Sequence, residues 1–149
     1  DFIYKIRENI RMIVNHNNFS LEYIKKNSQH KRSIIQYENT FNNNQNLYDP
    51  ISIVYFLRNK ELFVDDKFIF DIFKPKINKK IGMRVIGEEI IYAMKNNYEC
   101  FILAPFNINN EKGKIKLWIS KKTKLPIIIE QDGKNGKIIL KLKSILNDN

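Results

Sequence analysis

The sequence has 149 residues, of which 43% are hydrophobic and 28% charged, a composition that suits one globular domain with a real core. Its apolar runs fall well short of the roughly 20 residues of a membrane-spanning helix, and its single cysteine, Cys100, excludes intrachain disulfides, zinc ribbons and thiol redox pairs. The net charge of +10 suits nucleic acid, anionic lipid or an acidic partner, but abundant Asn, Ile and Lys, all with AT-rich codons, make compositional bias an equal explanation.

The first third of the chain predicts extended segments. It starts at Asp1 rather than Met, which indicates a processed chain or a fragment: one domain over residues 1–149, with missing N-terminal strands or a missing signal segment as an open alternative. The apolar residues before position 15 fit a helix about as well as a strand, and we favour an extended segment over 7–14. Further strands are predicted over 19–25 and 33–38, and an Asn-rich loop over 41–46.

Residues 50–58 carry the signals of one short helix. Asp49 suits the N-cap, because its carboxylate accepts N–H groups of the first turn, and Pro50 suits the first helical position. Arg58 lies in the last turn, where a cation favours the helix dipole, and Asn59 is expected to end the helix in a left-handed conformation. Apolar residues cover both sides: Ile51, Val54 and Tyr55 on one, and Ile53, Phe56 and Leu57 on the other. We therefore expect a helix that is buried on both sides, with strands around it.

From residue 61 onward, alternating apolar and polar residues predict an antiparallel meander with one wet face. The expected strands cover 67–74, 77–93, 98–104, 114–120, 125–131 and 137–146. Gly87 marks a bulge or bend within the second of these strands, and Pro105 is expected to end the third. The expected turns and loops fall at 75–76, 95–97, 107–112, 121–124 and 132–136. In the last strand, Ile138, Leu140 and Leu142 are expected to point inward.

Several short motifs stand in order along residues 20–146. The first is the helical stretch Tyr48-Asp49-Pro50-Ile51-Ser52-Ile53-Val54-Tyr55-Phe56-Leu57-Arg58. The others are Gly87-Glu88-Glu89, Asn96-Asn97-Tyr98-Glu99-Cys100, Pro105, Leu117-Trp118-Ile119-Ser120, Pro126 and Gly136. Together they resemble the bacterial domain of unknown function 3108, whose blocks read Y/L-D-P-L-S-A-L-Y-Y-L-R, G-x-E, G-x-F-x-C, I-W-L-S and R-I-P-V.

The resemblance implies a mainly β (α+β) fold, in which a curved antiparallel sheet forms a half-barrel around the short buried helix at 50–58, as in lipoprotein carriers. It also implies an envelope protein of Gram-negative bacteria, in the periplasm or at the periplasmic face of the outer membrane, often lipid-anchored and without an assigned enzymatic activity. The family usually has acidic residues just after its Trp-x-Ser element, where this chain has Lys121 and Lys122. That departure argues against a cation-binding or acidic-partner role for this turn.

No catalytic, metal or cofactor site is predicted. The sequence has no G-x-S-x-G, Walker, H-E-x-x-H or G-x-G-x-x-G motif, and His16 and His30 lie in polar segments without metal-ligand spacing. Cys100 shares a strand face with Tyr98 and Ile102, and a lone cysteine in such a place is far more often a core residue than a nucleophile. We therefore expect a protein without a cofactor and without enzymatic activity.

The candidate groove or structural residues come mostly from the family motifs. They are Tyr48, Asp49, Pro50, Ser52, Tyr55, Phe56, Arg58, Glu89, Cys100, Trp118, Ser120 and Pro126. Trp118 alternates with Lys116 and Ser120, so its ring either forms the lip of a cavity or packs on the sheet, packing being the commoner case. Arg58 and Glu89 are expected to form an ion pair that ties the helix end to the sheet, the alternative being two solvated charges.

A candidate basic face consists of Lys114, Lys116, Lys121, Lys122, Lys141 and Lys143. It is either a docking surface for anionic lipid headgroups or an ordinary solvated surface. The resulting hypothesis is a non-enzymatic envelope protein that binds a lipid, an acyl chain or a lipoprotein on the concave side of a half-barrel. The alternative is an interaction or scaffold subunit of an envelope assembly without a small-molecule ligand. Nucleic-acid binding is a remote alternative, because the lysines are dispersed and the aromatic residues lie mostly on apolar faces.

Overall fold

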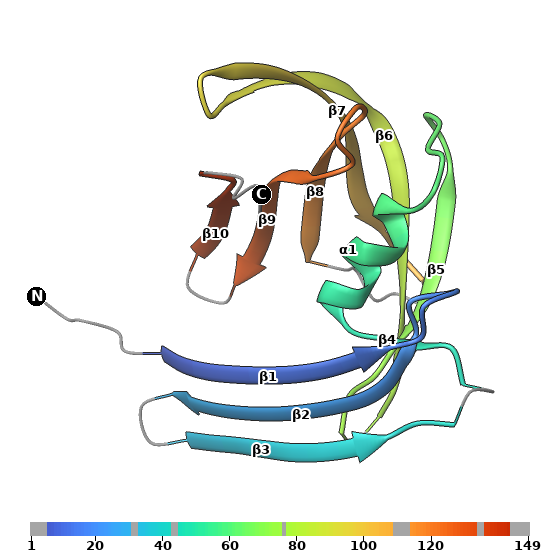
Figure 1. Cartoon of the computed structure of the whole chain (residues 1–149), viewed down its shortest axis with the longest axis vertical. Coiled ribbons are helices and arrows are strands. Elements are labelled where there is room, and N and C mark those ends of the chain that lie inside the picture. Colours follow the sequence, from blue (N-terminus) through green and yellow to red (C-terminus); the bar gives the residue numbers. More distant parts are fainter. Residues whose placement is uncertain are drawn as a thin grey trace, which may run out of the picture. The chain divides into compact units, whose positions relative to one another are not determined.

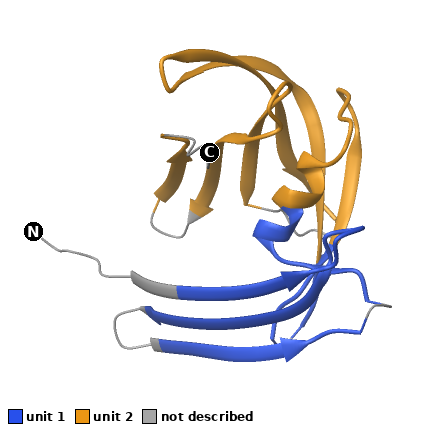
Figure 2. Ribbon diagram, in the orientation of Figure 1, with its two compact units in different colours: residues 1–53, 71–79 blue, residues 54–70, 80–149 orange. Residues whose placement is uncertain are grey.

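The chain forms two compact units, one of residues 1–53 and 71–79 and the other of residues 54–70 and 80–149 (Figure 2). The computed structural model describes residues 6–30, 33–42, 45–75, 77–108, 114–133 and 136–143. The boundary between the units runs through the helix α1 (Pro50–Arg58) and the strand β5 (Lys67–Ile72), so each of these elements contributes to both. The described residues form a mainly β fold with one short helix and a curled half-barrel sheet of seven strands, as predicted (Figure 1). The first three strands form a separate three-stranded sheet, which the sequence did not predict.

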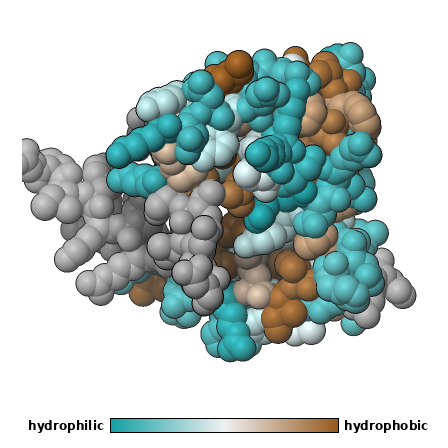
Figure 3. All heavy atoms as spheres, turned by 45° about the horizontal axis from the view of Figure 1, so that its top comes forward, coloured by the Kyte–Doolittle hydropathy of each residue, from teal (hydrophilic) through white to brown (hydrophobic). Residues whose placement is uncertain are grey.

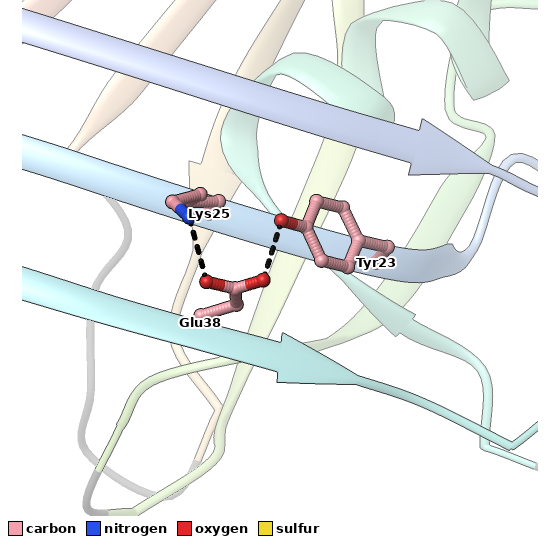
Figure 4. A network of polar contacts seen from close by, with 3 residues as sticks. All are labelled: Tyr23, Lys25 and Glu38. Atoms are coloured by element: carbon pink, nitrogen blue, oxygen red, sulfur yellow. Dashed lines mark hydrogen bonds and ion pairs between the residues drawn. The ribbon is translucent and has the colours of Figure 1, made fainter.

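The first unit contains the three-stranded sheet. Its strands β1 (Ile6–Val14), β2 (Leu21–His30) and β3 (Ser33–Thr40) pair antiparallel in the order β1-β2-β3, which confirms the three extended segments predicted from the sequence. Leu21 and Ile24 are buried, whereas other positions of β2 place polar side chains beside those of the neighbouring strand β3. There the Lys25 ammonium lies 2.8 Å from Glu38, and the Tyr23 hydroxyl donates to the same carboxylate at 2.8 Å (Figure 4).

A short parallel strand and an aromatic cluster complete the first unit. β4 (Leu47–Tyr48) pairs in parallel with the end of β5 at Asp71 and Ile72. The Phe73 ring makes edge contacts with the rings of Tyr37 and Phe41, at centroid distances of 5.7 and 4.8 Å. Of the predicted 41–46 loop, residues 43 and 44 lie outside the described residues, as do the apolar positions 2–4 at the start of the chain.

Helix α1 begins and ends at the predicted residues. The Asp49 carboxylate accepts the Ser52 N–H at 2.7 Å, and the Ser52 hydroxyl accepts the Asp49 N–H at 2.9 Å, so the two residues cap each other as in a capping box. At the other end, Asn59 donates its side-chain amide to the Tyr55 carbonyl at 2.9 Å. The predicted left-handed conformation of Asn59 is therefore wrong, because its φ is not positive and its side chain satisfies the end of the helix instead.

The expectation that the helix is buried on both sides is also wrong. Ser52, Ile53 and Leu57 are buried, but Ile51 and Tyr55, four residues apart on one face, are 43% and 46% exposed. The Arg58 guanidinium lies over the Tyr55 ring at 5.4 Å, so this face is covered only in part, and by a side chain of the helix itself. On another face the Phe56 ring contacts the rings of Phe68 and Phe70 in β5 at 6.2 and 5.3 Å.

The strands of the second unit form most of the seven-stranded sheet, whose order is β10-β9-β8-β7-β6-β5-β4. They are β5, β6 (Lys79–Ala93), β7 (Asn96–Phe106), β8 (Ile115–Ser120), β9 (Pro126–Gly133) and β10 (Gly136–Lys141). Each neighbouring pair from β6 to β10 is antiparallel, as predicted. The register shifts between Val85 and Gly87, whose φ of 155° confirms the predicted bulge at that glycine.

Several strand ends differ from the predictions. Pro105 does not end β7, because it still pairs with Met83 of β6. β7 pairs with β8 only over Cys100–Leu103, so the missing N–H of Pro105 costs no hydrogen bond to β8. The β6–β7 turn lies at Met94 and Lys95, both with positive φ, rather than at 95–97. β5, β6 and β10 are shorter than the predicted 67–74, 77–93 and 137–146. The predicted positions 76, 109–112, 134–135 and 144–146 lie outside the described residues.

Burial across β8 and β10 also departs from the prediction of one wet face. In β8 both faces are buried, with Leu117 and Ile119 on one and Trp118 and Ser120 on the other, because a second apolar cluster covers the Trp118 face. In β10 every residue is exposed, so Ile138 and Leu140 do not lie in the core. Exposed large apolar side chains occur on several elements, and the face drawn in Figure 3 shows them as separate patches among polar ones.

Candidate functional site

The predicted motif residues of the second unit meet around Trp118. Register places Glu89 opposite Cys100 and Cys100 opposite Ser120, so residues from β6, β7 and β8 lie in one row on one face of the sheet. The Trp118 indole N–H donates to the Glu89 carboxylate at 2.8 Å, which joins β8 to β6 across β7. Three separate sequence motifs are thus brought together by one antiparallel register.

Trp118 packs in a small core of its own. It is 8% exposed and lies with Ala93, Cys100 and Ile127 in a buried cluster. Further apolar side chains that pack against this cluster are Ile91, Tyr98, Ile102, Leu125, Ile128 and Leu142. Lys116 places its ammonium over the indole at 4.4 Å, which covers the outer side of the ring. These contacts favour the packing interpretation of Trp118 over that of a cavity lip.

Cys100 has the environment of a core thiol. It is fully buried, and its thiol donates to the Tyr98 carbonyl at 3.4 Å. Burial, and secondarily the neighbouring Glu89 carboxylate, raises the pKa of the Cys100 thiol to about 11. Because the thiolate is the nucleophilic form, this environment opposes nucleophilic chemistry at neutral pH.

Two hollows adjoin this cluster on either side of Glu99 and Lys121. One, of about 300 Å³, is lined by residues 88–90 with Glu99, Cys100 and Lys121. The other, of about 460 Å³, lies between residues 96–99 at the start of β7 and residues 120–123 in the β8–β9 turn. The Lys121 ammonium forms an ion pair with Glu88 at 2.5 Å and lies over the Phe101 ring at 5.0 Å, so it is held between these hollows. Their walls offer amide, hydroxyl, ammonium and carboxylate groups for hydrogen bonds.

The predicted ion pair between Arg58 and Glu89 does not form. The Arg58 Nε–H donates instead to the Lys124 carbonyl at 3.0 Å, while Glu89 accepts from Trp118. Lys124 has a φ of 57°, in the left-handed region, and this conformation shapes the β8–β9 turn whose carbonyl Arg58 reaches. The helix end is therefore tied to the sheet as expected, but through a backbone carbonyl that no residue type in the sequence could reveal.

The other candidate residues lie apart from the Trp118 cluster. Tyr48, Asp49, Pro50 and Ser52 belong to the first unit, where the Tyr48 hydroxyl donates to the Asn18 carbonyl at 3.2 Å and Asp49 caps the helix. Burial raises the pKa of the Tyr48 hydroxyl. In the second unit, Pro126 pairs with Ile119 at the start of β9. Ser52 is the capping partner that sequence reasoning did not assign, although the spacing Asp-x-x-Ser signals it.

The candidate basic face is mixed in charge. Lys116 and Lys141 lie on the same side of the sheet by register, but β9 places Glu130 opposite Lys116. Lys137 forms an ion pair with Glu130 at 2.7 Å. Lys114, Lys122 and Lys143 are exposed just outside the strands.

An apolar row crosses the opposite side of the sheet. Register aligns Val85, Leu103, Leu117, Ile129 and Leu140, one residue from each of the five strands β6 to β10. The first three are at most 1% exposed, Ile129 is half-buried and Leu140 is 60% exposed. The row therefore runs from the core to the free edge of the sheet and becomes uncovered on the way.

The part of the chain that the structure describes contains neither a cluster of potential metal ligands nor a membrane-spanning helix. Within these residues, His, Cys, Asp and Glu side chains nowhere gather in threes suited to a metal ion. The described part also contains no helix with the length and apolar character needed to span a membrane.

The fold and site define a mainly β protein, with a curled half-barrel sheet, one capped helix and no recognisable catalytic constellation among its described residues. A family model described as "Protein of unknown function (DUF3108)" matches residues 1–143, so the chain belongs to this family. The match confirms the resemblance found in the sequence and extends it to the start of the chain. Searches of the curated proteins and of the solved structures each found no match.

Proposed function

We propose that this protein is a non-enzymatic component of the bacterial cell envelope that binds an apolar chain of a lipid, an acyl group or a lipoprotein. The observation that carries the proposal is the apolar row from Val85 to Leu140, buried at one end and exposed at the other. A closed core would bury the whole row, whereas a row that emerges at an open sheet edge offers apolar surface to a ligand. The envelope location follows from the motifs that resemble the family, and is part of the proposal.

The exposed end of the apolar row has the chemistry of a binding site for an aliphatic ligand rather than of a catalytic site. Leu140 and the half-buried Ile129 offer only aliphatic surface, and burial of such surface contributes about 25 cal/mol per Å². The high pKa of the Cys100 thiol speaks against acyl transfer through that residue.

The test uses two lysine substitutions that place the new charge on opposite faces of β10. Leu140→Lys places a charge on the apolar row, whereas Ile139→Lys, at 58% exposure, places the same charge on the opposite face of the same strand. Protein purified from its own host is analysed by native mass spectrometry and lipid extraction, and uptake of a fluorescent fatty acid is titrated for each variant. We expect bound lipid and saturable uptake in the wild type and in Ile139→Lys, with both lost in Leu140→Lys. An empty wild-type protein, or equal loss in both variants, would refute the proposal.

A further inference from the structure

Strand β10 is an open edge of the seven-stranded sheet with an unusual side-chain pattern. It stands last in the strand order and, among the described residues, pairs only with β9. Its sequence from Lys137 to Lys141 is Lys-Ile-Ile-Leu-Lys, and Ile138, Ile139 and Leu140 are 54%, 58% and 60% exposed. Natural proteins usually protect such an edge, because unpaired strand backbone beside apolar side chains is a template for another strand.

The hydrogen bonds of the edge identify which backbone groups are available. The Leu142 N–H donates to the Ile127 carbonyl at 2.9 Å, in continuity with the β9–β10 register. In antiparallel pairs, residues alternate between bonding to the partner strand and pointing away from it. The even-numbered residues of β10 therefore bond to β9. Lys137, Ile139 and Lys141 direct their N–H and C=O groups outward.

The charges of the edge decide between two occupants. Pairing with a second copy would be antiparallel about a two-fold axis, and only the register centred on Ile139 sets all three apolar residues against apolar ones. That register also sets Lys137 against Lys141 of the other copy, twice, and like charges directly opposite are destabilising. Glu130 of β9 pairs with Lys137, but no carboxylate among the described residues pairs with Lys141. A strand with carboxylates at these two positions would instead gain a new opposite-charge pair at Lys141 and share Lys137 with Glu130.

We propose that β10 is a docking edge for an extended segment of a partner protein, in which apolar residues are flanked by acidic ones and which adds as a further antiparallel strand. Backbone bonds from Lys137, Ile139 and Lys141 supply the attachment, and the lysines select the partner by charge. The inference goes beyond the proposed lipid binding, because it uses the backbone edge rather than the apolar row.

The first experiment measures selection by charge. Fluorescence anisotropy follows a labelled peptide Gly-Glu-Val-Ile-Val-Glu-Gly, blocked at both ends, and a counterpart with Lys in place of each Glu, at low salt with the full chain. Because each flanking pair changes the binding constant roughly 1.5- to 5-fold, we expect the Glu peptide to bind at least fivefold more tightly. Lys141→Glu should remove that preference, whereas Lys122→Glu, at an exposed lysine of the β8–β9 turn, should retain it.

The second experiment tests the backbone edge. Ile139→Pro removes one outward N–H at a position where an edge strand tolerates proline, and Ile139→Val keeps the N–H with a similar side chain. Binding should be lost in the proline variant and retained in the valine variant. A peptide methylated on alternate amide nitrogens should lose binding for one of the two sets only, which tests the edge even if the proline variant does not fold.

The results of these experiments distinguish an acidic partner strand from a second copy of the chain. Equal affinity for both peptides, no binding of either, or full binding by a folded Ile139→Pro variant would overturn the proposal. Wild-type dimers in sedimentation that are abolished by Ile139→Pro would also overturn it, in favour of a second copy.

Discussion

The reciprocal cap between Asp49 and Ser52 gives the sharpest prediction for stability. Asp49 is 6% exposed and Ser52 fully buried, and two hydrogen bonds of 2.7 and 2.9 Å join them. Asp49→Ala removes the acceptor of the Ser52 N–H at a site that water reaches poorly. Loss of an N-cap costs about 0.5–2 kcal/mol, and a buried amide left without an acceptor costs about 1–3 kcal/mol. Because both figures describe the same lost bond, we expect the free energy of unfolding to fall by about 2 kcal/mol.

The assay is urea denaturation followed by circular dichroism. With a slope near 2 kcal/mol per molar, a loss of about 2 kcal/mol lowers the midpoint by about 1 M. The matched control is Asp49→Asn, which keeps a side-chain oxygen at the cap and should change stability by less than about 0.5 kcal/mol. If the Ala and Asn variants shifted the midpoint equally, the bond geometry would not be the source of the stability, and the capping argument would fail.

The same cap has a pH dependence with a defined sign. Burial raises the pKa of the Asp49 carboxyl above its ordinary value of 3.8, and the bonds from Ser52 act in the opposite direction. A raised folded pKa gives a contribution to stability that is fully present below the unfolded pKa and is lost as the pH rises through the folded pKa. Relative to Asp49→Asn, the wild type should therefore lose stability as the pH rises from below 3.8. A constant difference across that range would contradict the raised pKa.

Further predictions concern the second unit. Trp118→Phe and Glu89→Ala should each destabilise, and their double-mutant cycle in urea should give a coupling of about 1–2 kcal/mol; zero coupling would mean that the 2.8 Å bond contributes nothing. Gly82→Ala should lower the melting temperature, because the new Cβ would lie 2.5 Å from the Phe106 ring, and Phe106→Leu should restore most of the loss. Cys100, with a thiol pKa of about 11, should react with iodoacetamide at pH 8 only when urea unfolds the protein; fast labelling of the native form would show an accessible thiol.

Local chemistry accounts for the parts of the fold that the sequence predicted. Asp49 and Pro50 define the start of α1, Gly87 marks the bulge, and alternation identifies the strands, because each signal acts within a few residues of itself. The exposure of Ile51 and Tyr55 could not be predicted in this way. The helical spacing of apolar residues shows that one face of a helix is apolar, but it does not show whether another element covers that face.

Four of the candidate residues lie close together, but the contacts of the candidates were not predictable from the sequence. Glu89, Cys100, Trp118 and Ser120 were all candidates, and a single register gathers them. The partner of Arg58 was wrong, because the Lys124 carbonyl belongs to the backbone and becomes available only through a left-handed turn. Sequence patterns carry side-chain chemistry, whereas backbone acceptors appear only with the tertiary structure.

The β6–β7 hairpin has two parts that differ in how many neighbouring strands support them. β6 and β7 pair from Gly82 with Phe106 to Ala93 with Asn96, yet β8 supports β7 only over Cys100–Leu103. On the open side of that support β6 still pairs with β5, but on the turn side residues 90–98 pair only with each other among the described residues, and ribbons of two strands have little stability of their own. The amide hydrogens of the ribbon should therefore exchange with solvent through local opening, whereas those of the part supported by β8 should exchange only through global unfolding. Ile90 and residues 96–98 of this ribbon line the two hollows, so a ligand bound there would hold the two strands of the hairpin together and slow that opening.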